Sequence, residues 1–168
     1  TGSGCIAISL LKRIPASGVA VELSAPALEV ARRNAVIQKI GSRLTFLQAD
    51  VLDSPLIPEL IAKSDVIVSN PPYINTDVIE TLSADVRNEP RMALDGGADG
   101  MIFYRRFILD YARLMKPSAV MVLEIGYDQS ERIYELCQTV GFGCELKRDF
   151  SGNYRVAVIA GIKKCKEE

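Results

Sequence analysis

The chain has 168 residues, of which 48% are hydrophobic and 24% charged, and this balance is typical of one soluble globular domain. Its 20 Lys and Arg residues against 21 Asp and Glu residues leave a net charge of −1, which argues against overall electrostatic attraction to nucleic acid. The absence of histidine excludes a Cys/His zinc site and an imidazole base, and we expect no bound metal.

The composition also favours a cytoplasmic location. No apolar run approaches the length of a membrane span, and we find no secretory signal at the start of the sequence. The cysteines form no CxxC pair, and scattered unpaired cysteines are typical of a reducing compartment. We interpret all four as small core residues: Cys5, Cys137, Cys144 and Cys165.

The first half of the chain alternates helices with short apolar runs. A helix is predicted after a glycine turn, at residues 4–12. Ser24 is expected to cap a second helix that runs to about Gln38, with Pro26 tolerated in its first turn. Strands are predicted where apolar runs are followed by polar breaks, at residues 19–23, 44–48 and 65–69.

The second half opens with a long irregular stretch, residues 73–100, in which we expect one short helix near 77–82. Such long loops in compact domains are usually functional or disordered. Apolar periodicity then predicts a helix over residues 101–115, and a fully apolar run predicts a strand over 119–125.

A last helix is predicted to begin after Asp128, with Glu131 completing a capping-box pattern, and to end at Gly141. Two further strands are separated by a loop of hairpin length. They are predicted at residues 143–148 and 154–162, before a charged and frayed tail at 163–168.

This order of elements predicts an α/β fold: a Rossmann-like, mostly parallel sheet with helices on both faces and an antiparallel strand from the C-terminal hairpin. The chain opens at Thr1-Gly2-Ser3-Gly4, a glycine turn that normally follows a strand. We therefore expect that the first, central strand is missing. Residues 1–168 are interpreted as one N-terminally truncated domain, or as a chain completed by another segment.

Three consecutive strand ends suggest a crevice for a nucleoside. Gly2 and Gly4 let the backbone approach a ligand, and the helix after them directs its first amides towards it. Glu22 ends the next strand and can accept hydrogen bonds from both ribose hydroxyls. Asp50 follows the third strand end, where it can accept from an adenine amino group or simply close a turn. With Ala7, the two glycines equally fit the GxGxxA pattern of nicotinamide enzymes.

The sequence Asn70-Pro71-Pro72-Tyr73 follows the strand predicted at 65–69, at the sheet edge expected for the glycine turn. It can be an ordinary strand-ending turn, but consecutive prolines also stiffen the loop. The Asn70 side-chain oxygen and the Pro71 carbonyl would then be two fixed acceptors for a planar NH2 group. Such acceptors orient the nitrogen and stabilise the positive charge that it gains on methylation. Tyr73 can stack on the planar group or face the cation.

These motifs carry a family resemblance. Thr1-Gly2-Ser3-Gly4-Cys5-Ile6-Ala7 together with Asn70-Pro71-Pro72-Tyr73-Ile74 resembles class I methyltransferases that act on exocyclic or amide nitrogens. Three further stretches narrow the resemblance to the release-factor glutamine methyltransferases (PrmC/HemK). These are residues 89–100 running into Tyr104-Arg105, residues 123–126 with Gln129, and residues 149–156.

The resemblance implies S-adenosylmethionine as cofactor, S-adenosylhomocysteine as product, and N5-methylation of the Gly-Gly-Gln glutamine of peptide chain release factors. It also implies an upstream helical domain beyond this sequence. We further expect a monomer that binds no membrane and no nucleic acid directly. The resemblance assigns catalysis to Asn70, Pro71 and Tyr73, and substrate binding to these residues and Pro72. It assigns cofactor binding to Thr1, Gly2, Gly4, Glu22, Asp50 and Asn70, with Glu22 standing where the family more often has Asp.

Three alternatives remain open from the residues. The chain can be an N-methyltransferase of nucleic-acid bases (rRNA guanine-N2 or DNA adenine-N6), a non-enzymatic binding fragment, or a nicotinamide oxidoreductase. The glycine-rich stretch 89–100 is interpreted either as a set of tight turns or as a cover over the active site or a docking surface. Arg91 within it is expected to form a structural ion pair.

Overall fold

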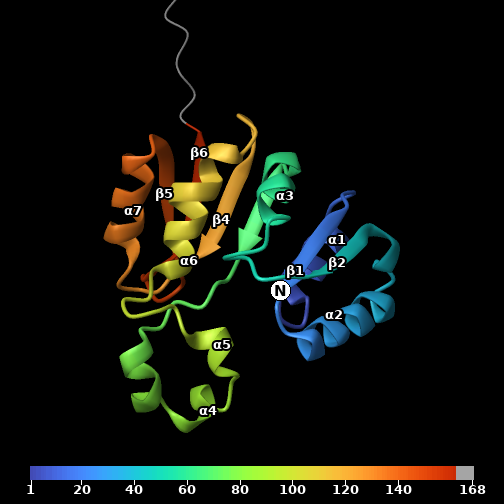
Figure 1. The fold of residues 1–168 in the computed structure, drawn as a ribbon, viewed down its shortest axis with the longest axis horizontal. Helices are drawn as coiled ribbons and strands as arrows, with labels where there is room; N and C mark the ends of the chain where they lie inside the picture. Colours follow the sequence, from blue (N-terminus) through green and yellow to red (C-terminus); the bar gives the residue numbers. More distant parts are fainter. Residues whose placement is uncertain (162–168) are drawn as a thin grey trace, which may run out of the picture. The chain divides into compact units, whose positions relative to one another are not determined.

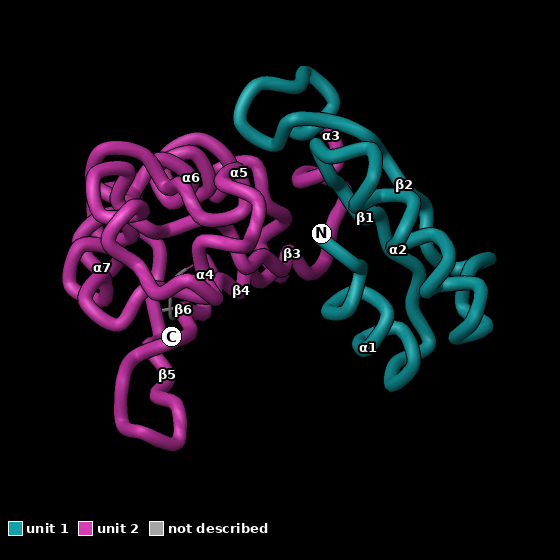
Figure 2. The backbone as a smooth tube through the Cα atoms, turned by 90° about the horizontal axis from the view of Figure 1, so that it is seen from below, with its two compact units in different colours: residues 1–57 teal, residues 58–168 magenta. Residues whose placement is uncertain are grey.

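The computed structural model describes residues 1–161 (Figure 1). The last residue of the strand predicted at 154–162, the tail at 163–168 and Cys165 lie outside the described residues. The chain divides into two compact units, Thr1–Ile57 and a second unit that begins at Pro58 (Figure 2). Each unit has its own sheet, with two strands in the first and four in the second.

The first unit consists of α1 (Cys5–Arg13), β1 (Gly18–Glu22), α2 (Ala25–Ile37), the short helix η1 (Gly41–Arg43) and β2 (Leu44–Gln48). The two strands are parallel, and Glu22 pairs with Gln48, so both end at the same edge. Ser24 caps α2 as predicted, because its hydroxyl accepts the Ala27 N–H at 3.4 Å.

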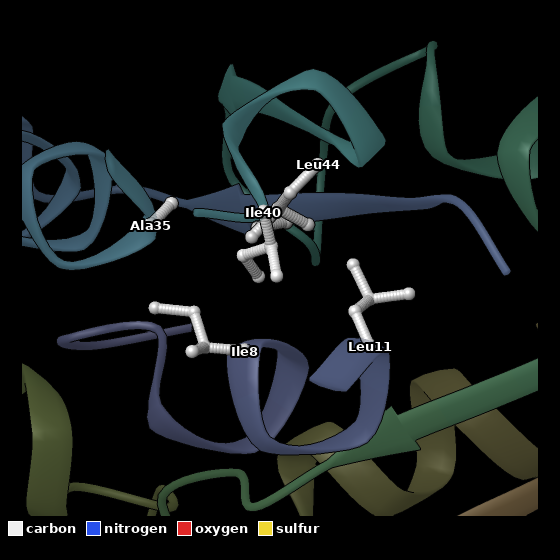
Figure 3. Close-up of a cluster of buried hydrophobic side chains, with 6 residues drawn as sticks. Ile8, Leu11, Ala35, Ile40 and Leu44 are labelled. Carbon is white, nitrogen blue, oxygen red and sulfur yellow. The ribbon is translucent and has the colours of Figure 1, made fainter. Parts of the chain in front are cut away.

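The core of the first unit lies between its helices and strands. Ile8 and Leu11 of α1 point towards the opposite layer, which carries Ala35 of α2, Ile40 and Leu44 (Figure 3). All five side chains are at most 6% exposed. The spacing of Ile8 and Leu11 puts both on one face of α1, and this face packs against the core.

The second unit holds a four-stranded sheet in the order β3–β4–β6–β5. The strands are β3 (Val66–Ser69), β4 (Val120–Glu124), β5 (Phe142–Arg148) and β6 (Tyr154–Gly161). β3 and β4 are parallel, and β6 runs antiparallel to both of its neighbours. The predicted α/β fold, with parallel strands and a C-terminal antiparallel hairpin, is confirmed.

The helices and helical turns that connect these strands are α3 (Ile57–Lys63), η2 (Thr76–Thr81), α4 (Ala84–Arg87), α5 (Arg91–Leu94), α6 (Ile102–Arg105), η3 (Arg106–Tyr111), η4 (Ala112–Leu114) and α7 (Ser130–Thr139). Of these, α7 packs on β5 and β6. No helix in residues 1–161 has the length and apolar character needed to cross a bilayer.

Several local predictions need correction. The helix predicted over 101–115 is one helical stretch of three types, α6, a π-helical η3 and a 3-10 η4. The last helix begins at Ser130, so Asp128 does not cap it; the preceding residue, Gln129, directs its side chain into the interior instead. Gly141, with φ +73°, follows the end of this helix as predicted. The sequence analysis missed the short helices α3, α4 and α5.

β3 is less buried than its apolar sequence suggests. It pairs only with β4 among the described residues, and Val66 and Val68 are 59% and 38% exposed. The predicted absence of a first central strand, and the reading of residues 1–168 as one domain, stay predictions.

Candidate functional site

The glycine turn at the start of α1 is tightly built. Gly2 and Gly4 have φ of +58° and +80°, the left-handed region that favours glycine. A Cβ on Gly4 would lie 3.1 Å from Ile8 Cδ1 and 3.2 Å from the Ala31 Cβ, so the close packing of α1 on α2 also favours glycine here. No side chain caps α1, which leaves its first amides available to a ligand.

Glu22 holds this turn in place. Its Oε2 accepts hydrogen bonds from the backbone nitrogens of Thr1 and Gly2 at 2.9 and 2.7 Å, and its Oε1 accepts the Ser24 N–H at 2.9 Å. Burial acts to raise the pKa of Glu22, but the hydrogen bonds from Ser24 and Gly2, together with the ammonium group of Thr1, outweigh burial and leave the pKa lowered. Glu22 is therefore a fixed carboxylate at the carboxyl end of β1.

Asp50 lies two residues beyond β2, at the same edge of the two-stranded sheet. Its Oδ1 accepts the Leu52 N–H at 2.8 Å and its carbonyl accepts the Ser54 N–H at 3.0 Å, which is the turn role considered from the sequence. The structure thus brings Thr1, Gly2 and Glu22 into direct contact. The cofactor role of these residues, of Gly4 and of Asp50 stays a prediction.

In the second unit, the sequence Asn70-Pro71-Pro72-Tyr73 leaves the carboxyl end of β3; we call these four residues the corner. Pro71 is buried and Asn70 is exposed. Within residues 1–161, no hydrogen bond engages the Asn70 side chain or the Pro71 carbonyl. The corner therefore has two acceptors that the described part of the chain leaves uncommitted, on a proline-stiffened backbone, and their role as acceptors for a substrate amide stays a prediction.

The half-buried Tyr73 side chain lies among charged groups of the second unit. Burial raises the pKa of its phenol, the nearby Glu124 carboxylate raises it further, and the Arg155 guanidinium opposes both. Arg155 in turn pairs with Asp149 at 3.5 Å and lies over the Tyr127 ring, 5.9 Å from its centroid. Tyr73 is therefore neutral at physiological pH.

A glycine-rich loop, residues 94–100, forms hydrogen bonds with the backbone that follows the corner. The Ile74 N–H donates to the Leu94 carbonyl at 3.0 Å, and the Gly96 N–H donates to the Ile74 carbonyl at 2.8 Å. The Thr76 hydroxyl donates to Asp95 Oδ1 at 2.6 Å. These bonds make a short parallel bridge between residues 74 and 95, so the loop and the corner form one unit of structure.

The glycines of this loop do more than permit turns. Gly97 and Gly100 have φ of +88° and +71°, as the turn interpretation predicts. A Cβ on Gly96 would lie 2.8 Å from the Tyr73 Cα, and a Cβ on Gly100 would overlap the Tyr73 carbonyl oxygen. Close packing on Tyr73 therefore requires glycine at both positions.

Gln129 contacts the backbone of the corner, and no role was predicted for it from the sequence. It is only 3% exposed, and its Nε2 donates to the carbonyls of Tyr73 and Gly100 at 3.0 and 3.1 Å. Its Oε1 accepts the Gly126 N–H at 2.9 Å. Gln129 stands in a run of polar residues, 127–132, so no local feature distinguishes it, and it entered the sequence analysis only through the family resemblance.

Arg91 forms the ion pairs expected of a structural residue. Its guanidinium lies 3.3 Å from Glu80 Oε1 and 3.5 Å from Asp95 Oδ2. The side chain is 56% exposed, so the pairs with Arg91 contribute little to stability. The prediction of an ion pair is confirmed.

The profile of the methyltransferase small domain matches residues 1–122. The chain belongs to this methyltransferase family. The match includes both the glycine turn with Glu22 and the corner, the two groups of residues from which the methyl-transfer interpretation was argued.

Curated relatives confirm the resemblance to glutamine methyltransferases. The methyltransferase chain is 44% identical over 142 residues to the release factor glutamine methyltransferase of Moorella thermoacetica, covering 84% of this chain and 49% of that protein. It is 41% identical over 170 residues to the enzyme of the same name from Bacillus subtilis, with coverages of 99% and 57%. The ribosomal protein uL3 glutamine methyltransferase of Bordetella pertussis is 42% identical over 130 residues, with coverages of 77% and 42%. The chain spans about half the length of the release-factor relatives that it matches.

Solved structures confirm the fold. The hMettl16 catalytic domain in complex with an RNA hairpin matches with a TM-score of 0.70 at 17% identity, covering 96% of this chain and 61% of that one. An RNA methyltransferase from Salinibacter ruber in complex with S-adenosyl-L-homocysteine matches with a TM-score of 0.57 at 15% identity, with coverages of 99% and 80%. At these identities the likeness concerns the fold alone.

Proposed function

We propose that this chain is the catalytic part of an S-adenosylmethionine-dependent enzyme that methylates the side-chain amide nitrogen, N5, of the glutamine in the Gly-Gly-Gln loop of peptide chain release factors. The observation that carries the proposal is the corner, which presents two free acceptors after β3. Relatives named glutamine methyltransferases, 44% and 41% identical to this chain, support it.

The residues of the first unit fit a nucleoside cofactor. Gly2 and Gly4 keep side chains out of the turn, and the uncapped start of α1 offers backbone donors. Each Glu22 carboxylate oxygen has lone-pair sites beyond the contacts it makes within the turn, so Glu22 can still accept from ribose hydroxyls. When bound, S-adenosylmethionine supplies an electrophilic methyl group on a positively charged sulfur.

The corner would act on the substrate amide. The Asn70 Oδ1 and the Pro71 carbonyl each accept one N–H of the glutamine NH2 group, which fixes the direction of the nitrogen lone pair. Tyr73, neutral and half-buried, packs against the planar amide.

The proposed reaction needs no strong base. The nitrogen lone pair forms the new N–C bond while the C–S bond breaks and its electron pair stays on sulfur. Positive charge develops on the nitrogen, where Asn70 and Pro71 stabilise it as fixed acceptors. One N–H proton is then lost to water, giving the neutral methylated amide. This sequence agrees with a chain that contains no histidine.

The charges around Tyr73 favour a protein substrate over a nucleic acid. Arg155 is paired with Asp149, and Glu124 and Glu89 both contribute negative charge at Tyr73. A base N-methyltransferase would be favoured by a basic stripe beside Tyr73. The described surroundings of Tyr73 instead mix both signs.

The test is methyl transfer from labelled cofactor, with the full-length gene product as enzyme. Release factor, ribosomal protein uL3 and total RNA and DNA are offered in parallel, and peptide mass mapping locates the methyl group. We expect one methyl on the Gly-Gly-Gln glutamine of the release factor. Labelling of uL3 alone would keep the glutamine chemistry and replace the substrate, whereas labelling only of nucleic acid would reject the proposal.

A further inference from the structure

We propose that Gln129 is a positioning residue that sets the place of the corner through the backbone of Tyr73. The inference rests on the proposed function, because it concerns the residues that would hold the substrate amide. It adds a residue that touches neither substrate nor cofactor, and acts by fixing the groups that do.

The geometry of the Gln129 amide is the first support. Both of its N–H bonds are used, one on the Tyr73 carbonyl and one on the Gly100 carbonyl. Its oxygen accepts the Gly126 N–H, just beyond the end of β4. A flipped amide would put its oxygen against two carbonyl oxygens, so only one orientation satisfies all three bonds.

Burial makes the three hydrogen bonds of Gln129 hard to replace. Gln129 is 3% exposed, so water cannot replace its contacts, and removing the amide would leave buried polar atoms without partners. The amide thus ties the corner and the glycine loop to the turn after β4. β4 is a central strand of the four-stranded sheet, flanked by β3 and β6, and gives the corner a rigid reference.

The loop supplies the second, independent support. A Cβ on Gly100 would approach the Tyr73 carbonyl, and would lie 2.7 Å from both Asn75 Oδ1 and Gln129 Nε2. A Cβ on Gly97 would meet only Ile102, at 3.4 Å or more, although Gly97 has a similar positive φ. The tolerance for bulk is therefore smallest where the loop touches the corner.

The experiment uses Gln129→Met in the full-length protein, since methionine keeps the length and bulk of glutamine but donates no hydrogen bond. We expect kcat for methyl transfer to fall about tenfold to a hundredfold, because small displacements of positioning groups cost that much. The cofactor Kd should change less than about twofold. Ile133→Val, a mild truncation of a fully buried side chain in α7, the helix that Gln129 precedes, controls for loss of stability.

Hydrogen exchange gives a readout that does not depend on activity. In Gln129→Met, the Ile74 and Gly96 N–H groups, which bridge the corner and the loop, should exchange faster. The N–H groups between β4 and β6 should not change. Ile133→Val should leave the exchange of Ile74 and Gly96 as in wild type.

A second pair of variants approaches the corner from the loop. Gly100→Ala and Gly97→Ala both introduce strain at a positive φ, but only Gly100→Ala adds bulk against Tyr73 and Gln129. We expect Gly100→Ala to lose turnover like Gln129→Met, and Gly97→Ala to retain more of it.

The measurements distinguish failure of the positioning role from failure of the proposed function. Unchanged kcat and unchanged exchange in Gln129→Met would overturn the positioning role, as would equal losses in Ile133→Val. If the wild-type protein methylates no glutamine, the proposed function fails, and faster exchange of Ile74 and Gly96 in Gln129→Met alone would still support control of the corner by Gln129.

Discussion

Asn70 and Glu22 illustrate two different states of a polar side chain at the end of a strand. Both carboxylate oxygens of Glu22 already accept hydrogen bonds within their own turn, from the N–H groups of Gly2 and Ser24. Asn70 makes no hydrogen bond within residues 1–161. Because Asn70 has no internal hydrogen bond to break, accepting an incoming NH2 group, as proposed, would only exchange its contacts with water.

We predict that Asn70→Ala lowers kcat for methyl transfer by about a hundredfold or more, the effect of losing one preorganised polar contact to the transition state. Cofactor affinity should be retained, because the cofactor is assigned mainly to Thr1, Gly2, Gly4, Glu22 and Asp50. Steady-state kinetics and calorimetric titration of the product measure the two quantities. Unchanged turnover would contradict the role assigned to Asn70.

At the scale of elements, Asp99 joins the glycine loop to two helices. Its carboxylate accepts from Arg105 of α6 at 3.0 Å and from the Met101 N–H at 3.2 Å, and its carbonyl accepts from Arg132 of α7 at 3.1 Å. Hydrogen bonds from Arg105 lower the pKa of Asp99 to about 2, with the Met101 N–H and Arg132 acting in the same direction against partial burial.

We predict that Asp99→Asn lowers the free energy of unfolding at pH 7 by about 1 kcal/mol or less, since pairs this exposed contribute little. A carboxyl whose pKa is lowered in the folded state stabilises the fold above its unfolded pKa, near 3.9. The difference between variant and wild type should therefore shrink as the pH falls from about 5 towards 2. Denaturant unfolding across this range measures it, and a difference independent of pH would refute the assignment.

The helical stretch from Ile102 to Leu114 shows a second effect at this scale. Its apolar periodicity predicted a helix, and the helix is present, but η3 is π-helical, with Arg106 pairing with Asp110 at 3.1 Å and contacting the Tyr111 hydroxyl. A periodic pattern specifies that a helix buries one face. It does not specify where the hydrogen bonding changes register, because that depends on the side chains packed against it.

At the scale of the whole molecule, a bound cofactor should stabilise the fold. A ligand that binds only the native state at a hundred times its Kd adds about 2.7 kcal/mol. We predict that S-adenosylhomocysteine raises the Tm by about 5–10 °C for a chain of this size. Glu22→Ala should lose most of this shift, and Glu29→Ala, which removes an exposed carboxylate of α2, should keep it. A comparable shift with a nicotinamide dinucleotide instead would revive the oxidoreductase interpretation.

The family, the α/β class and the succession of strands along the chain follow from the sequence, because each depends on local patterns. Apolar runs bounded by polar breaks located all six strands of residues 1–161 to within about a residue, and Ser24 correctly predicted the start of α2. The prediction that Asp128 caps the last helix was wrong. The residue before this helix is Gln129, whose side chain lies in the interior. No local pattern reveals this placement, since the partners of Gln129 lie 29 and 56 residues away.

The sequence alone determined which residues are proposed to carry the chemistry: a stiff proline corner, a glycine turn and acidic strand ends, whose properties belong to their own side chains and backbone. Only the tertiary structure decided how that corner is held. The loop at residues 94–100 and Gln129 reach Tyr73 because parallel pairing aligns β3 with β4, so that their carboxyl ends meet at one edge of the sheet. Hydrogen bonds between such distant segments exist only once the chain has folded, and the sequence on its own contains no spacing from which to infer them.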